Sequence, residues 1–498
     1  MLSRQFQTDG GDTRLFFGSF PIVAALTAFI LLASLYIERM VPQTVVALPF
    51  GVMMLIVAVF LASVWLMVLN EEVWIALAIL ALATFVVRTA DDAIGIEEVI
   101  YSVYGPPGLV FWFVRELFFK RKRLVHSTFD WMLLASVTIC LSIALISTIL
   151  HEGEMKFFVR EFTSFFMILI YFPIRKFLKD DRAVYRLVLL ITVLAVFNVV
   201  MNFLNYQERV VQSLMAYGEV NARSAIFEHL SIVFVCMMAA WVTFAKEWKW
   251  RIVGIGLFSL GAVGLVISLS RGPVVGAMAG IVAGLAFVPF SRSVKFFLTF
   301  IAIAIINIGL AYVLFPSMIE SVFANIGGRA ATMEKLSGDA SLQSRILEAK
   351  TLINRRIPDS PVIGHGYGVR YLFYDLAVRY SHRTGYTHNG YLFPIYKFGL
   401  PAGLFFLLTL FAPLFRIPFS GYRQLSYERR MVLVGAVSSL VGLLVANLTA
   451  QNISLYIHVV LYASTLAVID YLLADERIVL SRRRDLSSIE TVGMSKSV

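Results

Sequence analysis

The chain is poor in charge, because only 15% of its 498 residues are Asp, Glu, Lys or Arg, whereas 59% are hydrophobic. A soluble domain carries about 25% charged residues. Apolar stretches of roughly 20 residues, the length that spans a bilayer core, recur along the chain, which excludes a soluble enzyme with a single anchor. The runs are continuous, which also excludes a β-barrel, whose strands alternate in polarity.

Cysteine is scarce as well, with Cys140 and Cys236 as its two occurrences, each inside an apolar stretch. Neither a disulfide framework nor a cysteine metal site is supported, and we interpret both as packing residues. Glu228 and His229 are neighbours that point in different directions on a helix, and no H-E-x-x-H spacing occurs. Nucleotide-binding glycine motifs are missing. We therefore expect no metal and no cofactor, so that energy comes from the substrate or from a gradient.

The apolar runs predict an all-α protein, a polytopic transmembrane bundle of about 12 to 14 spans. Residues 96–118 are ambiguous, because Pro106 and Pro107 interrupt them. The candidate spans lie near residues 16–36, 44–69, 72–89, 128–149, 157–174, 186–204, 225–245, 252–270, 273–290, 296–315, 389–414, 430–450 and 454–473.

The net charge of +11 is interpreted as a topology signal rather than as a sign of nucleic-acid binding. Basic residues cluster in short connections such as 120–123 and 175–182, which the positive-inside rule assigns to the cytoplasm. Continuing the alternation also places the clusters near residues 246–251, 416–430 and 482–484 inside. With Arg4 and Arg14 inside too, parity favours an even number of spans.

Residues 316–388 form one long polar segment, which the topology places outside. Leu342, Ile346, Ala349 and Ile353 lie on one stripe of an amphipathic helix predicted over 341–356, which Pro358 ends. Nine basic and six acidic residues indicate an anionic ligand or lipid headgroups, although long loops also escape the positive-inside rule. The predicted regions are 1–124 (N-terminal transmembrane helices), 125–315 (central transmembrane bundle), 316–388 (periplasmic loop), 389–475 (C-terminal transmembrane helices) and 476–498 (cytoplasmic tail).

Three polar sites meet on the predicted outer side, at residues 221–224, 268–273 and 387–391. The first two carry Arg223 and Arg271. A guanidinium presents a planar fork of donors that suits phosphate, and so two outer arginines can clamp a pyrophosphate. The alternative is an anchor that bonds lipid headgroups, an interpretation that applies more strongly to Arg223.

His388 in the third site is a candidate general base, because an imidazole accepts protons near neutral pH. Asn389 beside it can orient the ring. The alternative is a hydrogen-bonded structural histidine at the membrane interface. His365 competes for the role, but it lies in the run Gly364–Gly368, whose glycines predict positive φ values and favour a structural loop.

Three signatures in this order resemble the O-antigen ligase and polymerase superfamily of bacterial membrane glycosyltransferases. They are Ser270–Gly272 after a span, Arg345 followed by Pro361–Gly368, and His388–Leu392 with two glycines behind it. The resemblance covers residues 223–450. His365 and Tyr367 depart from the apolar or proline residues usual in the family's glycine turn.

The resemblance implies transfer of a glycan from an undecaprenyl-pyrophosphate-linked oligosaccharide to an acceptor hydroxyl, with inversion and without metal or cofactor. It implies a multi-pass protein of the bacterial inner membrane whose active site faces the periplasm. Arg223 and Arg271 would bind the pyrophosphate, and His388 would activate the acceptor. Further substrate contacts are expected from Arg345, Tyr367, Asn389 and Tyr391.

The acceptor is left open. If the acceptor is a growing glycan, the chain is an O-antigen or exopolysaccharide polymerase, which the sequence of Thr387–Leu392 favours. If the acceptor is lipid A core, the chain is an O-antigen ligase. Membrane lipids and a chain-length regulator and flippase of the same pathway are the expected partners. A different class, a lipid-linked glycan flippase or other transporter, would place its substrate near the midplane and often shows repeated halves. A purely structural protein would leave Arg271 and His388 unexplained.

Overall fold

The computed structural model describes residues 66–67, 70–84, 96–217, 228–268, 270–291, 340–376, 380–450 and 458–474, with scattered positions from 293 to 312. The chain divides into two compact units, residues 1–122 and 123–498. Of the residues that carry predicted site roles, Arg223 lies outside the described residues.

In the first unit, a buried arginine network joins two helices. Arg115 donates to the Glu71 carboxylate at 2.6 Å and to the Glu116 carboxylate at 3.0 Å. The ambiguous segment 96–118 is helical in spite of its prolines, and its charged end is held by this network. The elements are α3 (Glu71–Thr84), α4 (Ile96–Val114) and a π turn (Arg115–Phe119).

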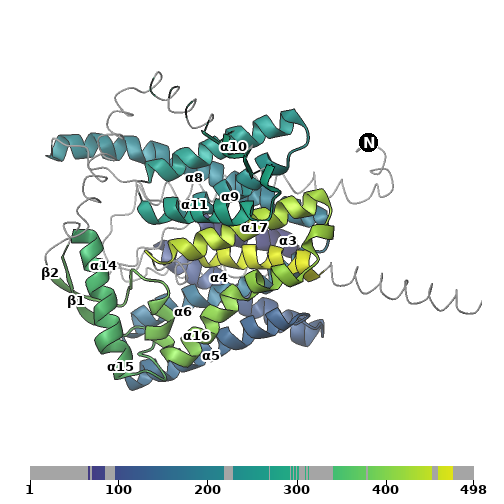
Figure 1. Ribbon diagram of the computed structural model, residues 1–498. Coiled ribbons are helices and arrows are strands. Elements are labelled where there is room, and N and C mark those ends of the chain that lie inside the picture. The colour runs from purple at the N-terminus through teal and green to yellow at the C-terminus, as the bar shows by residue number, and fades with distance from the viewer. Residues whose placement is uncertain are drawn as a thin grey trace, which may run out of the picture. The chain divides into compact units, whose positions relative to one another are not determined.

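The second unit is a bundle of apolar helices (Figure 1). Among the described residues, six helices are long and apolar enough to cross a membrane, and three shorter apolar helices accompany them. They match the spans predicted in these regions, which confirms the all-α polytopic bundle. The helices are α5 (Thr128–Leu150), α6 (Met155–Phe166), η2 (Met167–Ile170), α7 (Tyr171–Phe177), α8 (Asp181–Tyr217), α9 (Glu228–Phe244), α10 (Trp248–Ile267), α11 (Arg271–Leu285), α16 (Leu392–Arg416), η4 (Ile417–Phe419), η5 (Tyr422–Gln424), α17 (Tyr427–Ala446) and His458–Ala474.

The segment predicted as an external loop is ordered where the structure describes it, and it gathers at one end of the bundle (Figure 1). Its hairpin was not predicted: β1 and β2 pair antiparallel, with Tyr371 opposite Thr384 and Asp375 opposite Tyr380. Ser344 on α14 donates to Asp375 at 2.7 Å and so fastens the helix to the hairpin. The elements are α14 (Ala340–Thr351), a π turn (Leu352–Arg356), α15 (Ile357–Asp359), β1 (Tyr371–Asp375) and β2 (Tyr380–Thr384).

The predicted amphipathic helix is present, but its apolar stripe is not the face that the protein buries. Ser344, Glu348 and Leu352 are the buried residues, one helical turn apart, whereas Ile346 and Ile353 are exposed. The buried face is selected by the polar contacts of Ser344 and Glu348 and by the packing of Leu352 against Tyr371, Phe373 and Tyr396. The helix ends at Asp359, one residue after Pro358, which agrees with the stop predicted there.

Helices α11 and α17 pack at close range along a row of glycines. Gly276, Gly280 and Gly284 follow Gly272 at intervals of four residues, and a Cβ on any of them would collide with α17 or the residues directly after it. Small residues at this spacing allow helix backbones to approach closely in a membrane. The start of α11 therefore lies against the end of α17.

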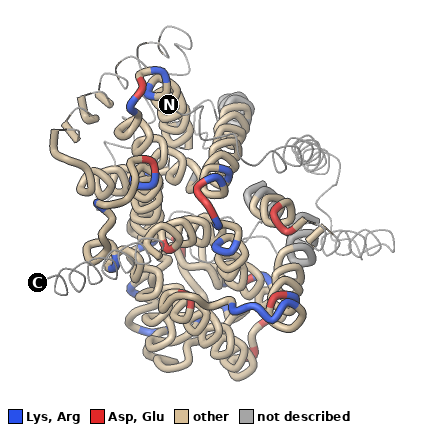
Figure 2. The backbone as a smooth tube through the Cα atoms, turned by 90° about the vertical axis from the view of Figure 1, so that its right-hand side faces the viewer, with Lys and Arg blue, Asp and Glu red and all other residues tan. Residues whose placement is uncertain are grey.

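At the C-terminal end of α16, a buried carboxylate joins three helices. Asp470 accepts from Arg175 of α7 at 3.0 Å and from Arg416 of α16 at 2.8 Å. Both arginines belong to the clusters predicted as cytoplasmic. Figure 2 shows that charges gather at helix ends and connections, while the helix bodies are largely uncharged.

Candidate functional site

The end of α17 brings two of the sequence motifs together. Gly272, directly after Arg271, packs against Thr449, and a side chain at this glycine would collide with it. Two residues before Thr449, the Asn447 carbonyl accepts the N–H of Gly390 at 2.9 Å, and a Cβ on Gly390 would collide with the Asn447 side chain. The arginine motif and the histidine motif therefore occupy the same end of the bundle.

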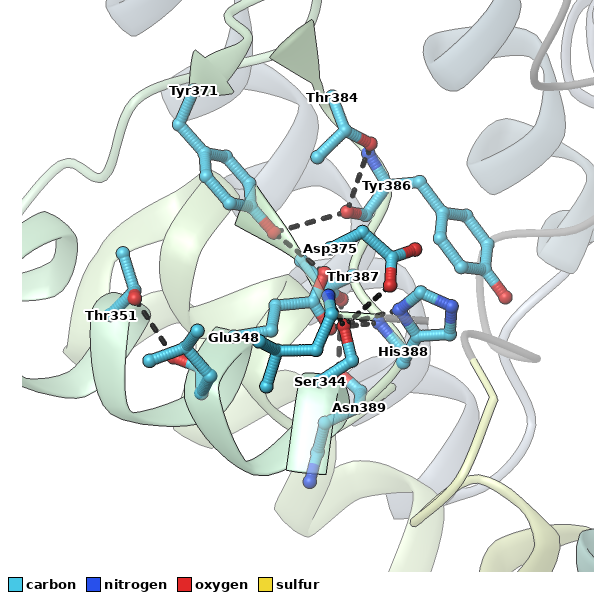
Figure 3. Close-up of polar contacts among 12 residues, drawn as sticks. Ser344, Glu348, Thr351, Tyr371, Asp375, Thr384, Tyr386, Thr387, His388 and Asn389 are labelled. Carbon is cyan, nitrogen blue, oxygen red and sulfur yellow. Dashed lines mark hydrogen bonds and ion pairs between the residues drawn. The ribbon is translucent and has the colours of Figure 1, made fainter. Parts of the chain in front are cut away.

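His388 is held by a buried glutamate from the loop (Figure 3). The Glu348 carboxylate on α14 is 1% exposed. Its Oε2 accepts the backbone N–H of His388 at 2.8 Å and lies 3.1 Å from the ring Nδ1. A carboxylate only accepts, so this contact selects the tautomer with hydrogen on Nδ1 and the lone pair on Nε2. The His388 side chain remains 37% exposed.

The carboxylate of Glu348 is fixed in turn by Tyr371 on β1. The tyrosine hydroxyl donates to Oε1 of Glu348 at 2.9 Å and lies 3.1 Å from the Tyr386 carbonyl. Burial, followed by the charge of Glu348, raises the pKa of Tyr371 well above its usual value, so the phenol stays protonated and remains a donor. Helix α14, the hairpin and the segment before α16 thus converge on one carboxylate.

Asn389 and Tyr391 shape the start of α16. The Asn389 side-chain oxygen accepts the N–H groups of Tyr391 at 2.9 Å and Leu392 at 3.1 Å. The Tyr391 hydroxyl donates to the Leu444 carbonyl of α17 at 2.6 Å. Glu348 forms the hydrogen bond to the His388 ring, whereas the sequence had suggested Asn389 for this role.

The glycine turn fills a break in α16. Gly399 has a φ of 78° and a ψ of 170° inside this helix, which interrupts the helical hydrogen bonds. The N–H groups of His365 and Gly366 donate to the carbonyls of Tyr396 and Lys397, each at 2.9 Å, and Leu400 donates to the Pro361 carbonyl at 2.7 Å. The turn therefore satisfies the backbone groups that the break releases, as irregular backbone at a membrane requires.

The positive φ values predicted for this turn are confirmed, with 63° at Gly364, 77° at Gly366 and 74° at Gly368. His365 is 6% exposed, and its ring stacks on Tyr396 with centroids 4.7 Å apart. Burial, with a smaller contribution from the nearby His151, lowers the pKa of His365 to about 4. A neutral, stacked ring agrees with the structural role expected for it.

Tyr367 was expected to contact substrate, but it is fully buried. Its ring packs against Phe158, Phe165 and Phe398. A side chain enclosed by other rings is a packing residue, and we do not include it in the proposed site.

Two other predicted site residues are described. Arg271 is exposed and opens α11 directly after Ser270, so the tight connection between α10 and α11 is as expected. Arg345 is partly exposed on α14, three residues before Glu348.

The family model described as O-antigen ligase matches residues 256–407. The match confirms the resemblance and indicates a membrane glycosyltransferase of the O-antigen ligase and polymerase type. It spans the stretch that contains Arg271, Glu348, the glycine turn and His388. No curated protein matches the chain.

Glu348 is the residue that sequence reasoning missed. It entered only as one of six acids in the loop. A weak signal was available, because Ser344, Glu348 and Leu352 are spaced four residues apart and therefore lie on one face of the helix. However, Ser and Glu are usually exposed, so their presence on that face does not indicate that it is buried.

Proposed function

We propose that this protein transfers a glycan from an undecaprenyl-pyrophosphate-linked donor to an acceptor hydroxyl at the periplasmic face of the bacterial inner membrane. The observation that carries the proposal is the contact between His388 and the buried Glu348, at the end of the bundle where the Arg271 motif also lies. A carboxylate that orients a histidine, with the second ring nitrogen left as acceptor, is the arrangement of a general base.

In this mechanism Nε2 of His388 takes the proton of the acceptor hydroxyl as its oxygen attacks the anomeric carbon. The bond to the pyrophosphate oxygen breaks on the opposite face, which inverts the anomeric configuration. Glu348 stabilises the imidazolium that forms. Arg271, with Arg223 and Arg345 as further candidates, compensates the charge of the departing pyrophosphate.

The acceptor that we favour is another lipid-linked repeat, which makes the activity polymerisation. Lipid A core as acceptor would make it ligation. Membrane lipids surround the site, and the chain-length regulator and flippase of the pathway would act beside it.

Transfer by the purified protein tests the proposal, with lipid-linked repeat units supplied in the presence or absence of lipid A core. The His388→Ala variant should lose about 100-fold to 10,000-fold in rate while it inserts and folds normally. His126→Ala is the control, because this histidine is exposed just before α5. It lies at the start of α5, whereas the end of α5 carries His151, which lies beside the glycine turn. Transfer by His388→Ala above about a tenth of the wild-type rate would rule out the base mechanism.

A further inference from the structure

A buried ion pair lies beneath the glycine turn, away from His388 itself. Lys397 of α16 is fully buried, and its Nζ lies 2.8 Å from Oε2 of Glu161 on α6. The same Nζ donates to the Val369 carbonyl at 3.2 Å, and Glu161 accepts the N–H of Gly368 at 3.0 Å. One ion pair thus joins two helices and the turn.

The segment that leads to His388 packs on the same pair. A Cβ on Gly385 would lie 2.8 Å from Oε1 of Glu161 and 3.4 Å from Nζ of Lys397. This glycine follows β2 and stands three residues before His388. The loop therefore meets the ion pair on both sides of the hairpin.

The first part of α16 depends on these contacts for its position. Gly399 separates residues 392–398 from the rest of the helix. Hydrogen bonds from the turn, rather than helical continuity, fasten the carbonyls of Tyr396 and Lys397. His388 stands directly before this short segment, so its position relative to Glu348 is set by the loop and by the pair.

Stability alone does not account for charges at this place. Desolvation offsets most of the attraction in a buried ion pair, and replacing such a pair by apolar residues of similar volume is often neutral or stabilising. The contacts of Glu161 and Lys397 are directional, because Glu161 also accepts the N–H of Gly368 in the turn and Lys397 also donates to the carbonyl of Val369 directly after it. These contacts therefore fix the positions of α6, α16 and the glycine turn relative to one another.

We propose that Glu161 and Lys397 are positioning residues, which hold the Gly385 segment and residues 392–398 so that the ring of His388 meets Glu348. Neither side chain touches substrate. The consequence for transfer rests on the function proposed above, whereas the consequence for the position of His388 does not.

The decisive variant is the double substitution Glu161→Gln with Lys397→Met, which removes both charges at similar volume. It should fold, keep KM within about twofold and lose about 100-fold in kcat, the loss expected from a displacement of about 1 Å. The matched control is Arg416→Met on the same helix, which removes a cation from Asp470 at the other end and leaves Arg175 in place. This control should lower stability and leave kcat unchanged.

A second measurement needs no substrate. Diethyl pyrocarbonate modifies accessible imidazoles, and mass spectrometry gives the rate for each histidine, with the exposed His126 as internal reference. His388 should react faster in the double variant than in the wild type. If the double variant does not fold, Gly385→Ala keeps both charges, crowds the pair and should give the same changes.

Wild-type kcat in the folded variant, or an unchanged modification rate at His388, would overturn the proposal. Equal losses of kcat in the double variant and in Arg416→Met would also overturn it, since both effects would then come from stability. If the wild type transfers no glycan, the proposed function fails, and the modification rates still decide whether the pair positions His388.

Discussion

Nδ1 of His388 lies 3.1 Å from a carboxylate oxygen of Glu348, although 40 positions separate the two residues in the chain. The contact joins the segment before α16 to α14, which lie at the same end of the bundle. It gives His388 a fixed orientation that its neighbours in sequence do not provide.

Glu348→Gln should therefore impair transfer nearly as much as loss of His388. The amide can present N–H₂ to Nδ1 and select the wrong tautomer, which leaves no base at Nε2. We expect a loss of about 100-fold or more in kcat with unchanged insertion. Asp359→Asn is the control, because this carboxylate lies on the same loop and is 58% exposed. Equal activity in both variants would remove Glu348 from the mechanism.

Arg271→Lys should weaken donor use although the charge is kept. Lysine is a point charge and cannot make the paired contact of a guanidinium, and one hydrogen bond to a charged group contributes about 1.5–3 kcal/mol, or roughly 10-fold to 100-fold in kcat/KM. The control is Arg251→Lys, which lies near the start of α10, whereas Arg271 follows the end of that helix. This control should have no effect on kcat/KM. Wild-type kinetics in Arg271→Lys would make this residue a lipid anchor.

The orientation of the bundle can be tested by cysteine labelling. Cys140 and Cys236 are buried, so they should not react. Lys350→Cys on α14 and Arg383→Cys on β2 occupy exposed positions, and both should react with a membrane-impermeant maleimide added to intact cells with a permeabilised outer membrane. Arg423→Cys should react only after the inner membrane is opened. The reverse pattern would invert the topology and every site assignment.

The helices were predictable from sequence because a membrane leaves the backbone few alternatives. Apolar runs located α5, α16 and α17 within a few residues, and the freedom of glycine to adopt positive φ values predicted the turn at Gly364–Gly368. These features depend on local chemistry, which a sequence displays directly.

The site was predictable only in part, because its contacts are tertiary. The motifs marked His388 and Arg271, but nothing near His388 points to Glu348 or Tyr371. The apolar stripe of α14 also misled, since Ile346 is exposed while Glu348 is buried. A buried polar face is selected by partners elsewhere in the chain, which periodicity does not contain.

The glycine row of α11 should be necessary for folding. A leucine at Gly280 would collide with the Ser438 carbonyl and with Cys236. Overpacking typically costs about 1–3 kcal/mol of stability, and we expect at least this cost here because one colliding group is backbone, which cannot rotate away. We expect Gly280→Leu to lower thermal stability in detergent and to reduce the amount of folded protein. Gly256→Leu on α10 is the matched control, since nothing lies within 4 Å of a Cβ there.

Acid should loosen the glycine turn through His365. An unfolded histidine has a pKa near 6.5, and the folded value of about 4 means that the unfolded state binds more protons between these values. The contribution of the neutral His365 to the free energy of unfolding is therefore complete above about pH 6.5. It is lost as the pH falls towards 4, and the loss is about 3 kcal/mol. Proteolysis of the turn should accelerate over this window in the wild type. In His365→Phe, which keeps the stack on Tyr396 and cannot bind a proton, the acceleration should be smaller. Identical pH profiles in the two proteins would show that carboxylates elsewhere, rather than His365, control the acid response.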